Sequence, residues 1–306
     1  MDRLKNAGFT DAMINRFFRP FMSGIFFNPA LTTSSRLFNF VMRMLATGQN
    51  CLPSKGIGEV AAQLERGLPS GSVRLHAGVV GAVGELGGGG GGDDEGVGGS
   101  SSSRQISLQG GGVVTAKRAV VVAVEGPAAK TLLGEPLNVS PSARGAAVGT
   151  TCLYFAIDGP APLPCPILYL NGDGPGLVNN CCFPSTVSSS YAPAGMSLAS
   201  VSIVGVPDMT DEELEAAVRG ELETWFGGSA TGGAGASGAQ PVSEWRHLRT
   251  YRIPFAQPNQ ITPTDLYRPV SLGKGLYVCG DHRSPATYDG AMLSGRLAAE
   301  AVIAAL

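Results

Sequence analysis

The residues best suited to chemistry stand near the end of the chain, in the segment GLYVCGDHRSPATYDGAMLSGRLAAEAV, 275–302. Its first five residues, GLYVC, are a short apolar run that predicts a strand buried on both faces. Gly280 lets a backbone pass close to a ligand. Asp281 would stand outside the carboxyl end of the strand, where open α/β sheets bind ligands. We therefore expect Gly280 and Asp281 to lie at a ligand site.

A helix is expected a few residues later, with Asp289 as its cap and Gly290, Ala291 and Met292 in its first turn. The unpaired N–H groups of such a turn attract ligand oxygens that carry negative charge. Small residues leave one side of the helix nearly flat, at positions 291, 294, 295, 298 and 299. The residues alone allow two interpretations: a ligand site, or a terminal strand-turn-helix that only packs the edge of a domain.

Few other side chains can be assigned a chemical role. His282 and Arg283 follow Asp281 directly and could face a ligand, but a solvated loop is the expected position of both. His76 and His247 lie in strand-like runs and are expected to be ordinary surface or core histidines. No acid-base pair stands out, so the catalytic residues stay unknown. A hydrolase is disfavoured because GMSLAS, 195–200, lacks the glycine that a nucleophile elbow needs after its serine.

Composition excludes several classes of function. The 306 residues include 22 basic and 24 acidic side chains, a net charge of -2, so no large positive field is available to bind nucleic acid. No apolar run reaches the roughly 18 residues that cross a bilayer. The first residues, MDRLKNAGFT, do not resemble a signal or transit peptide. Six cysteines in apolar surroundings, without metal-ligand spacing, favour reduced thiols in an intracellular compartment.

Helices are predicted where caps and a 3.6-residue period coincide. Thr210 and Glu213 form a capping box at the start of an amphipathic helix that ends near Trp225. Residues 34–48 open with a serine cap and stop at a glycine, and 54–69 predict a shorter helix that ends near Gly67.

Strands are predicted on both sides of a glycine-rich tract. Residues 72–83 and 104–127 are valine-rich and are expected to be strands of one sheet, joined by a disordered loop at 87–103. A second flexible loop is expected at 227–240. Several short runs between 146 and 206 predict a mainly antiparallel sheet. The order of elements indicates a mixed α/β (α+β) chain of two interleaved units.

The segment VCGDHRSPATYDGAMLSGRLAAEAV closely resembles the C-terminal FAD-binding segment of the flavin-containing amine oxidase and phytoene desaturase superfamily. Members of that family end with apolar-apolar-Gly-Asp, a short loop, then acidic-Gly-Ala-apolar-x-Ser-Gly and an alanine-rich helix. Residues 289, 290, 291, 294 and 295 fall on that pattern in register. The resemblance implies an FAD cofactor, with Gly280 and Asp281 near its diphosphate and ribityl chain, and Gly290, Ala291 and Met292 at N1 and O2 of the flavin.

Other segments resemble the family too. LPSKGIGEVAAQLERGLPSGSVRLHAGVVGAV, 52–83, resembles a Pro-x-x-Gly helix and the strand that follows, which places Val79 at the adenine. RAVVVAVEGP, 118–127, resembles a strand that would place Glu125 and Gly126 near the adenosine. The resemblance therefore implies a partial, Rossmann-like FAD domain interleaved with a substrate domain made of an antiparallel sheet and helices. Its expected divisions are 1–50, substrate-domain helices; 51–135, FAD domain; 136–255, substrate domain; and 256–306, C-terminal FAD-binding segment.

One family feature does not occur in the sequence: an initial strand followed by G-x-G-x-x-G and a helix. We therefore expect the C-terminal portion of a flavoprotein, which alone binds FAD weakly or not at all. The expected reaction is hydride transfer from an apolar or amine substrate to flavin N5, with oxygen or a quinone as electron acceptor. The alternative is a catalytically inactive binding or scaffold protein that keeps the fold without FAD.

The sequence does not identify the substrate. Amine substrates call for an aromatic cage, to which Trp245, Tyr251 and Tyr288 could contribute. RFFRPFMSGIFF, 16–27, gathers five phenylalanines beside two arginines. It is expected to be a core segment of the substrate domain, and the alternative is an apolar substrate tunnel or a peripheral membrane contact around Phe17 and Phe18. The expected location is intracellular, and the family resemblance is compatible with a plastid.

Overall fold

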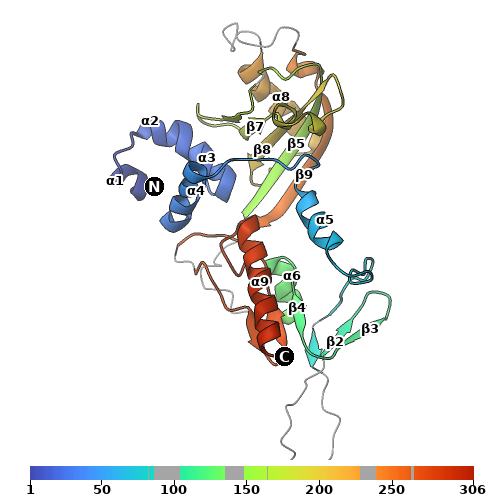
Figure 1. Cartoon of the computed structure of the whole chain (residues 1–306). Helices are drawn as coiled ribbons and strands as arrows, with labels where there is room; N and C mark the ends of the chain where they lie inside the picture. The colour runs from blue at the N-terminus through green and yellow to red at the C-terminus, as the bar shows by residue number, and fades with distance from the viewer. Residues whose placement is uncertain (82, 86–103, 135–147, 164, 228–238, 263–264) are drawn as a thin grey trace, which may run out of the picture. The chain divides into compact units, whose positions relative to one another are not determined.

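The computed structural model describes the chain except residues 82, 86–103, 135–147, 164, 228–238 and 263–264 (Figure 1). The loop expected at 87–103 lies outside the described residues, as does most of the loop expected at 227–240. The chain forms two compact units, each made of two stretches of sequence. The first unit contains residues 1–68 and 146–262, and the second contains 69–145 and 263–306.

An antiparallel sheet of five strands forms the centre of the first unit, in the order β6-β7-β8-β5-β9. The strands are β5 (Val148–Asp158), β6 (Leu168–Leu170), β7 (Val178–Cys182), β8 (Met196–Val204) and β9 (Arg246–Gln257). The antiparallel sheet expected between 146 and 206 is confirmed. β9 joins it from more than 40 residues further along the chain, where the sequence analysis had indicated only a strand-like run around His247.

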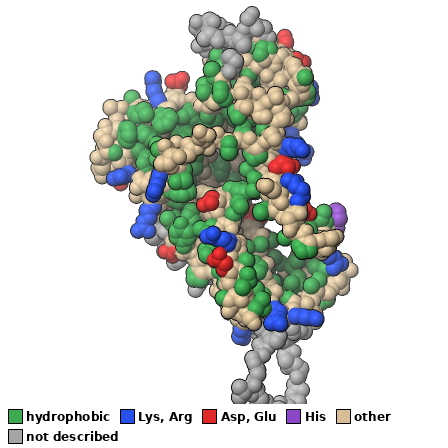
Figure 2. Space-filling view, in the orientation of Figure 1, with side chains coloured by type: hydrophobic (Ala, Val, Ile, Leu, Met, Phe, Trp, Pro, Cys, Tyr) green, Lys and Arg blue, Asp and Glu red, His purple; other side chains and the backbone are tan. Residues whose placement is uncertain are grey.

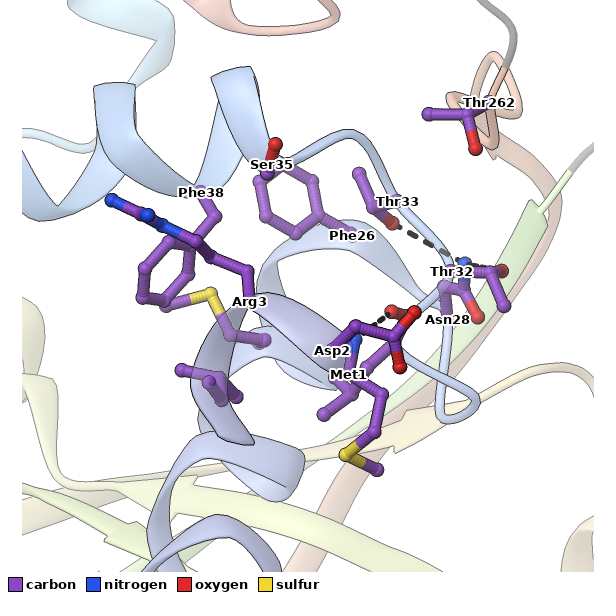
Figure 3. A pocket seen from close by; sticks show the side chains of 13 residues that line it. Met1, Asp2, Arg3, Phe26, Asn28, Thr32, Thr33, Ser35, Phe38 and Thr262 are labelled. Carbon is purple, nitrogen blue, oxygen red and sulfur yellow. Dashed lines mark hydrogen bonds between the residues drawn. The ribbon is translucent and has the colours of Figure 1, made fainter. Parts of the chain in front are cut away.

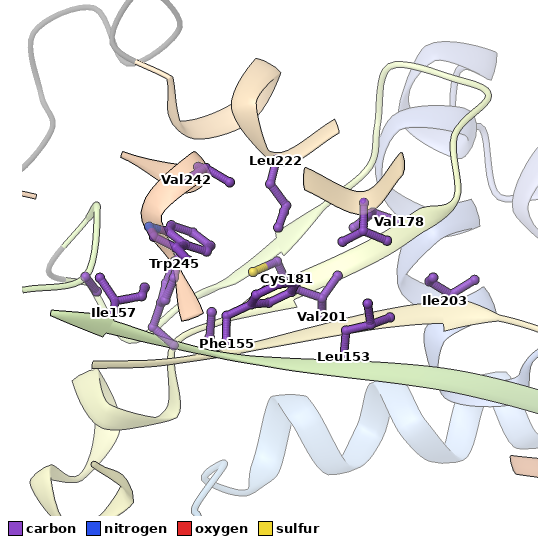
Figure 4. Packing of buried hydrophobic residues seen from close by; sticks show 14 of the residues in the cluster. Leu153, Phe155, Ile157, Val178, Cys181, Val201, Ile203, Leu222, Val242 and Trp245 are labelled. Atoms are coloured by element: carbon purple, nitrogen blue, oxygen red, sulfur yellow. The ribbon is translucent and has the colours of Figure 1, made fainter. Parts of the chain in front are cut away.

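Helix α8 (Asp211–Phe226) covers one face of this sheet. It starts with the predicted capping box: Glu213 N donates to Thr210 Oγ1 at 3.2 Å, and Thr210 N donates to Glu213 Oε2 at 2.9 Å. Leu214, Val218 and Leu222 of α8 are fully buried against alternate residues of β5 and β8, because successive strand residues point to opposite faces (Figure 4). The principal members of this core are Leu153, Phe155, Val201, Leu214, Val218, Leu222 and Trp245.

The N-terminal helices of the first unit build a smaller core. They are α1 (Asp2–Asn6), α2 (Asp11–Met13), a π-helical turn (Ile14–Phe18), α3 (Arg19–Phe26) and α4 (Ser35–Thr47). Helix α5 (Gly58–Arg66) follows and is not part of this core. Phe18 is buried there with Leu4 and Ile14, and the rings of Phe17 and Phe21 stack. The expected core role of segment 16–27 is therefore confirmed. Figure 2 shows other hydrophobic side chains gathered on the surface of this part of the unit. Phe9, between α1 and α2, is exposed.

Short elements complete the first unit. They are α7 (Pro184–Val187) and the 3₁₀ turns Ser189–Tyr191 and Val242–Glu244. The predicted start of α4 is confirmed, since Arg36 N donates to Ser34 Oγ at 3.3 Å. α5 ends at Arg66, with Gly67 at its C-cap, also as predicted.

Two small sheets lie in the second unit. One is antiparallel, with β1 (Gly84–Glu85), β2 (Arg104–Ser107) and β3 (Val113–Ala116). The other has the order β10-β11-β4, with β4 (Val120–Val122) parallel to β11 (Leu276–Val278) and β10 (Ser271–Gly273) antiparallel to it. Ala129 and Leu133 of helix α6 (Gly126–Leu133) pack on the parallel pair. The terminal helix α9 (Tyr288–Ala304) follows β11.

The expectation that 72–83 and 104–127 form strands of one sheet is wrong. Within 72–81 and at 83, pairing is limited to an isolated bridge from Val79 to Leu108. His76 and Gly81 have positive φ, of 53° and 73°, which breaks the extended conformation. Residues 104–116 and β4 belong to different sheets. The valines of these two segments therefore lie in separate packing environments and not in one sheet.

Candidate functional site

The carboxyl ends of β4 and β11 meet at one edge of the sheet, because the two strands are parallel. Cys279 N donates to Val122 O at 3.0 Å, which carries the pairing just past β11. Gly280 follows with a φ of 148°. A Cβ at Gly280 would lie 2.7 Å from both Cε1 and Nδ1 of His282. Glycine is thus required here twice, for its backbone angle and for the close approach of the imidazole.

Ser294 of α9 fixes the helix to the end of β11. Its side chain is fully buried. Gly280 N donates to Ser294 Oγ at 2.8 Å, and the hydroxyl lies 2.9 Å from Gly280 O and 2.8 Å from Ala291 O, the two carbonyls that can accept its proton. The residues that the sequence analysis assigned to the strand end and to the helix start are therefore held together by one side chain.

The cap of α9 differs from the expectation. Thr287, not Asp289, is the N-cap: it has an extended backbone, and Gly290 N donates to Thr287 Oγ1 at 2.9 Å. Asp289 lies in the first turn, where a carboxylate complements the positive end of the helix dipole. Threonine is also a good cap residue, and its extended backbone starts the helix two residues earlier than predicted.

Gly290 and Met292 occupy different surroundings within the first turns of α9. Gly290 is buried, and a Cβ there would collide with Pro285 O of the preceding loop. Met292 is exposed, as is Tyr288 at the start of the helix. Among the small residues, the buried face is formed by Gly290, Ser294 and Ala298. The flat side of α9 is therefore narrower than the sequence indicated.

His282 and Arg283 are buried, so the expectation of a solvated loop is wrong. Arg283 is 6% exposed, and the side chain of His282 is 8% exposed. Arg268 joins them from the preceding segment, since Arg268 N donates to Arg283 O at 2.9 Å and Arg268 Nη1 donates to His282 O at 3.2 Å. Burial lowers the pKa of both arginines, and Arg268 lowers the pKa of Arg283 further by repulsion.

These buried groups retain unused hydrogen-bonding capacity. Nε of Arg268, Nε of Arg283 and both ring nitrogens of His282 have no hydrogen-bond partner in the described part of the chain. Buried polar groups are nearly always satisfied, so each such atom requires an explanation. Positively charged hydrogen-bond donors at the carboxyl end of a parallel strand pair are suited to the anionic diphosphate of a dinucleotide such as FAD.

Comparison with known families gives a match over residues 1–303 to the family described as flavin containing amine oxidoreductase. The chain belongs to this family. Among solved structures it is similar to an oxidoreductase from Methanosarcina mazei, at 14% identity and a TM-score of 0.63 over 98% of this chain and 67% of the other. It is similar to a reduced UDP-galactopyranose mutase at 13% identity and a TM-score of 0.57, over 90% of this chain and 60% of that enzyme.

A third solved structure is a redesigned putrescine oxidase, with 14% identity and a TM-score of 0.51 over 81% of this chain and 53% of that one. At these identities the likeness concerns the fold. This amine oxidoreductase chain spans between about half and two thirds of the length of these structures. A search of curated proteins finds no match.

The remaining residues that the sequence assigned to the cofactor lie in three places. Asp281 is half-buried next to Gly280, with Oδ1 3.9 Å from His282 Nδ1. Glu125 is the N-cap residue of α6, immediately past β4, and Gly126 begins that helix. Both strand ends therefore carry an acidic residue at the same edge. Val79 is exposed at its bridge to Leu108, beside the antiparallel β2-β3 pair.

The aromatic residues considered for an amine cage are not equivalent. Trp245 is only 1% exposed, lies within the core of the first unit and donates from Nε1 to Gln240 O at 3.1 Å, so its assignment to a cage is wrong. Tyr251 is exposed on β9 and forms an edge-to-face pair with Tyr154 of β5, with ring centroids 5.9 Å apart. Burial, with a smaller contribution from Cys152, raises the pKa of Tyr154 to about 12. The sequence analysis did not single out Tyr154. This residue lies on the face of β5 opposite to that of Phe155.

A cavity of about 470 Å³ lies among the N-terminal helices of the first unit (Figure 3). Its apolar wall contains Leu4, Met22, Phe26 and Phe38. Polar side chains stand around it, and Asn28 Nδ2 donates to Thr33 Oγ1 at 3.2 Å and to Thr32 Oγ1 at 2.8 Å. A cavity with this mixture of linings suits a largely apolar small molecule that carries a polar group.

His76 and His247 have no evident role in this site. His76 lies exposed in the irregular segment before Val79. His247 is a partly buried histidine of β9, with Nδ1 3.2 Å from Glu215 Oε2 and Nε2 3.0 Å from Thr250 Oγ1. Both are thus ordinary surface or core histidines, as expected.

Metal ligands and membrane spans were also considered. Over the described ranges, His, Cys, Asp and Glu do not gather in threes with the geometry to hold a metal ion. In the same ranges, every helix is too short or too polar to span a bilayer.

Proposed function

We propose that this chain provides the cofactor site and substrate unit of an FAD-dependent oxidoreductase. The observation that carries the proposal is the junction of Gly280 and Ser294, which joins the end of β11 to the start of α9 beside two arginines whose buried Nε atoms have no hydrogen-bond partner among the described residues. Membership of the flavin containing amine oxidoreductase family supports it. In this proposal the second unit is a partial Rossmann-like FAD domain, and the first is the substrate domain.

The residues that would hold FAD divide by the part of the molecule they contact. We assign Gly280 and Asp281 to the diphosphate and ribityl chain, and Val79 to the adenine. Ala291 and Met292, with Gly290 before them, are assigned to the pyrimidine edge of the flavin. The exposure of Met292 and the positive end of the α9 dipole support this assignment, since a reduced flavin carries negative charge at that edge.

In this reaction class a substrate carbon gives a hydride to flavin N5, and oxygen or a quinone then takes the electrons. The chain's own contribution is placement. Ser294 holds α9 at a fixed distance from β11, and Thr287 fixes the first turn. The dipole of a 17-residue helix then stabilises negative charge beside that turn without any movement.

The substrate that we propose is an apolar molecule or an amine. The apolar wall of the cavity in Figure 3 supports the first, and the aromatic pair Tyr154–Tyr251 supports an amine. Arg249 already lies over the Tyr251 ring, 5.0 Å from its centroid, so this ring can hold a cation on its face. Turnover with benzylamine and with a long-chain polyene, followed by hydrogen peroxide release and by reduction of a quinone dye, distinguishes the two substrates and the two acceptors.

Cofactor binding is the direct test. We expect FAD to bind weakly but saturably to the purified chain, with quenching of flavin fluorescence, and the Gly280→Val variant to bind at least about tenfold more weakly because its side chain meets His282. Gly295→Val on the outer part of α9 is the control, since no atom lies within 4 Å of its Cβ position. If the folded chain shows no saturable binding at millimolar FAD, the inactive scaffold protein becomes the better interpretation.

A further inference from the structure

Arg283 is buried and Arg268 is half-buried at the end of β11, and neither has an acidic partner among the described residues. Arg283 donates through Nη2 to Pro269 O, and Arg268 donates through Nη1 to His282 O. These acceptors are neutral carbonyls. Within the residues that the structure describes, neither guanidinium forms an ion pair. Asp265 acts on Arg268 only at longer range. It raises the pKa of Arg268, but burial lowers this pKa by more.

Two neighbouring arginines in this position destabilise the folded state unless an anion binds beside them. Burial removes water from Arg283 and from Nε of Arg268, and a buried charge normally has a partner of opposite sign. The two arginines also repel each other, which depresses the pKa of Arg283. Nε of each is unpartnered. The cluster therefore has two positive charges and free donors in a place where α/β sheets bind ligands.

Three backbone amides around this turn are already engaged. Gly280 N donates to Ser294 Oγ at 2.8 Å, and Arg283 N donates to Gly280 O at 3.1 Å. Gly290 N is bound to Thr287 Oγ1. An anion that approaches Gly280 therefore does not find these three donors free, and neighbouring side chains are a further source of donors. His282 lies nearest, with its imidazole against Gly280. Neither ring nitrogen has a hydrogen-bond partner among the described residues, and Asp281 Oδ1 lies 3.9 Å from Nδ1.

We propose that Arg268, His282 and Arg283 bind the diphosphate group of a dinucleotide at the end of β11. The inference rests on the proposed function and assigns the charge recognition of that site to these three side chains. Guanidinium groups bind phosphate oxygens through paired hydrogen bonds, and two of them match the two negative charges of a dinucleotide diphosphate.

The experiment uses the full chain and measures binding of inorganic pyrophosphate, ADP and adenosine by calorimetry. Arg283→Gln and Arg268→Gln are each expected to weaken pyrophosphate and ADP by about 10- to 100-fold, the loss of one charge-assisted bond, and to leave adenosine unchanged. Arg296→Gln is the matched control: Arg296 lies on α9 in the same unit but is exposed, and we expect a change of less than about twofold.

Folding is checked separately because Arg283 is buried. Arg283→Lys keeps the charge and loses the paired hydrogen bonds, so it should retain the fold and bind pyrophosphate with intermediate affinity. Raising the salt concentration should weaken pyrophosphate binding in the parent and less so in Arg268→Gln. The proposal is overturned if pyrophosphate does not bind the parent, or if folded Arg268→Gln and Arg283→Lys both bind it as the parent does.

Riboflavin, which has no diphosphate, separates this inference from the proposed function. Parent binding of FAD and riboflavin with no effect of either arginine variant on FAD would keep the proposed function and remove the inference. Binding of pyrophosphate that depends on both arginines, with no binding of riboflavin or FAD, would keep the inference and remove the flavin assignment.

Discussion

At the residue scale, the site depends on side chains that satisfy the backbone. Ser294 is a small polar residue in an alanine-rich helix, yet it accepts from one backbone amide and lies within hydrogen-bond distance of two carbonyls. The sequence analysis placed Gly280 and Ser294 in one motif through resemblance. It did not predict the burial of His282 and Arg283, because a loop rich in polar residues is normally solvated and the contacts of Arg268 come from a segment 15 residues earlier.

Cys181 gives a residue-scale prediction for the first unit. Its thiol is fully buried, and burial raises its pKa well above 9.0 in the folded protein. The unfolded chain therefore loses this proton first as pH rises, so the free energy of unfolding should fall above pH about 9, by up to about 1.4 kcal/mol per pH unit. Below that pH the thiol is protonated in both states and adds no pH dependence.

Urea unfolding at pH 7, 8, 9 and 10 measures this effect. The Cys181→Ala variant should be less stable than the parent at pH 7, because it loses packed volume, but should lose less stability between pH 8 and 10. Cys165→Ala, at an exposed position, should follow the parent curve. Equal alkaline losses in the parent and Cys181→Ala would rule out this thiol as the cause.

At the scale of elements, local signals predicted helices better than strands. The capping box of α8, the serine cap of α4 and the glycine after α5 are short-range features, and all three are confirmed. The strand expected at 72–83 failed because positive φ at His76 and Gly81 is not visible in a valine-rich pattern. The cap of α9 was missed because Thr287 and Asp289 are both good caps, and only the loop geometry decides between them.

Two glycines of α9 provide a matched pair of substitutions. A Cβ at Gly290 collides with Pro285 O, whereas nothing lies within 4 Å of a Cβ at Gly295. We expect Gly290→Ala to destabilise the second unit by about 1–3 kcal/mol through overpacking, and Gly295→Ala to stabilise it by about 0.5–1 kcal/mol through helix propensity. Thermal unfolding followed by hydrogen exchange of β11 and α9 amides measures both. Changes of the same sign in the two variants would contradict the assigned packing.

At the scale of the whole molecule, interleaving limits what sequence patterns reveal. The order of helices and strands correctly indicated a mixed α/β chain with two interleaved units and an antiparallel sheet. The pairing of β9 with β5, and of β11 with β4, joins segments about 90 and 150 residues apart, and no local pattern specifies such partners. The candidate site shares this property, because Cys279 N reaches Val122 O only after β11 has paired with β4.

The core of the first unit should dominate that unit's stability. Leu222 is fully buried between α8 and the sheet, whereas Leu248 on β9 is 45% exposed. Leu222→Ala should lower the free energy of unfolding by about 2–5 kcal/mol, and Leu248→Ala by less than about 1 kcal/mol. Circular dichroism during denaturant unfolding compares the two. Similar losses would mean that α8 is not packed as described.

The position of Trp245 in that core has an optical consequence. The sequence contains two tryptophans, and the other, Trp225, packs against the same core, so both indoles belong to the first unit. Intrinsic emission excited at the indole band therefore reports the polarity around α8 and the five-stranded sheet, while the second unit contributes tyrosines only. Intrinsic tryptophan fluorescence therefore allows unfolding of the first unit to be followed while ligands are titrated into the second.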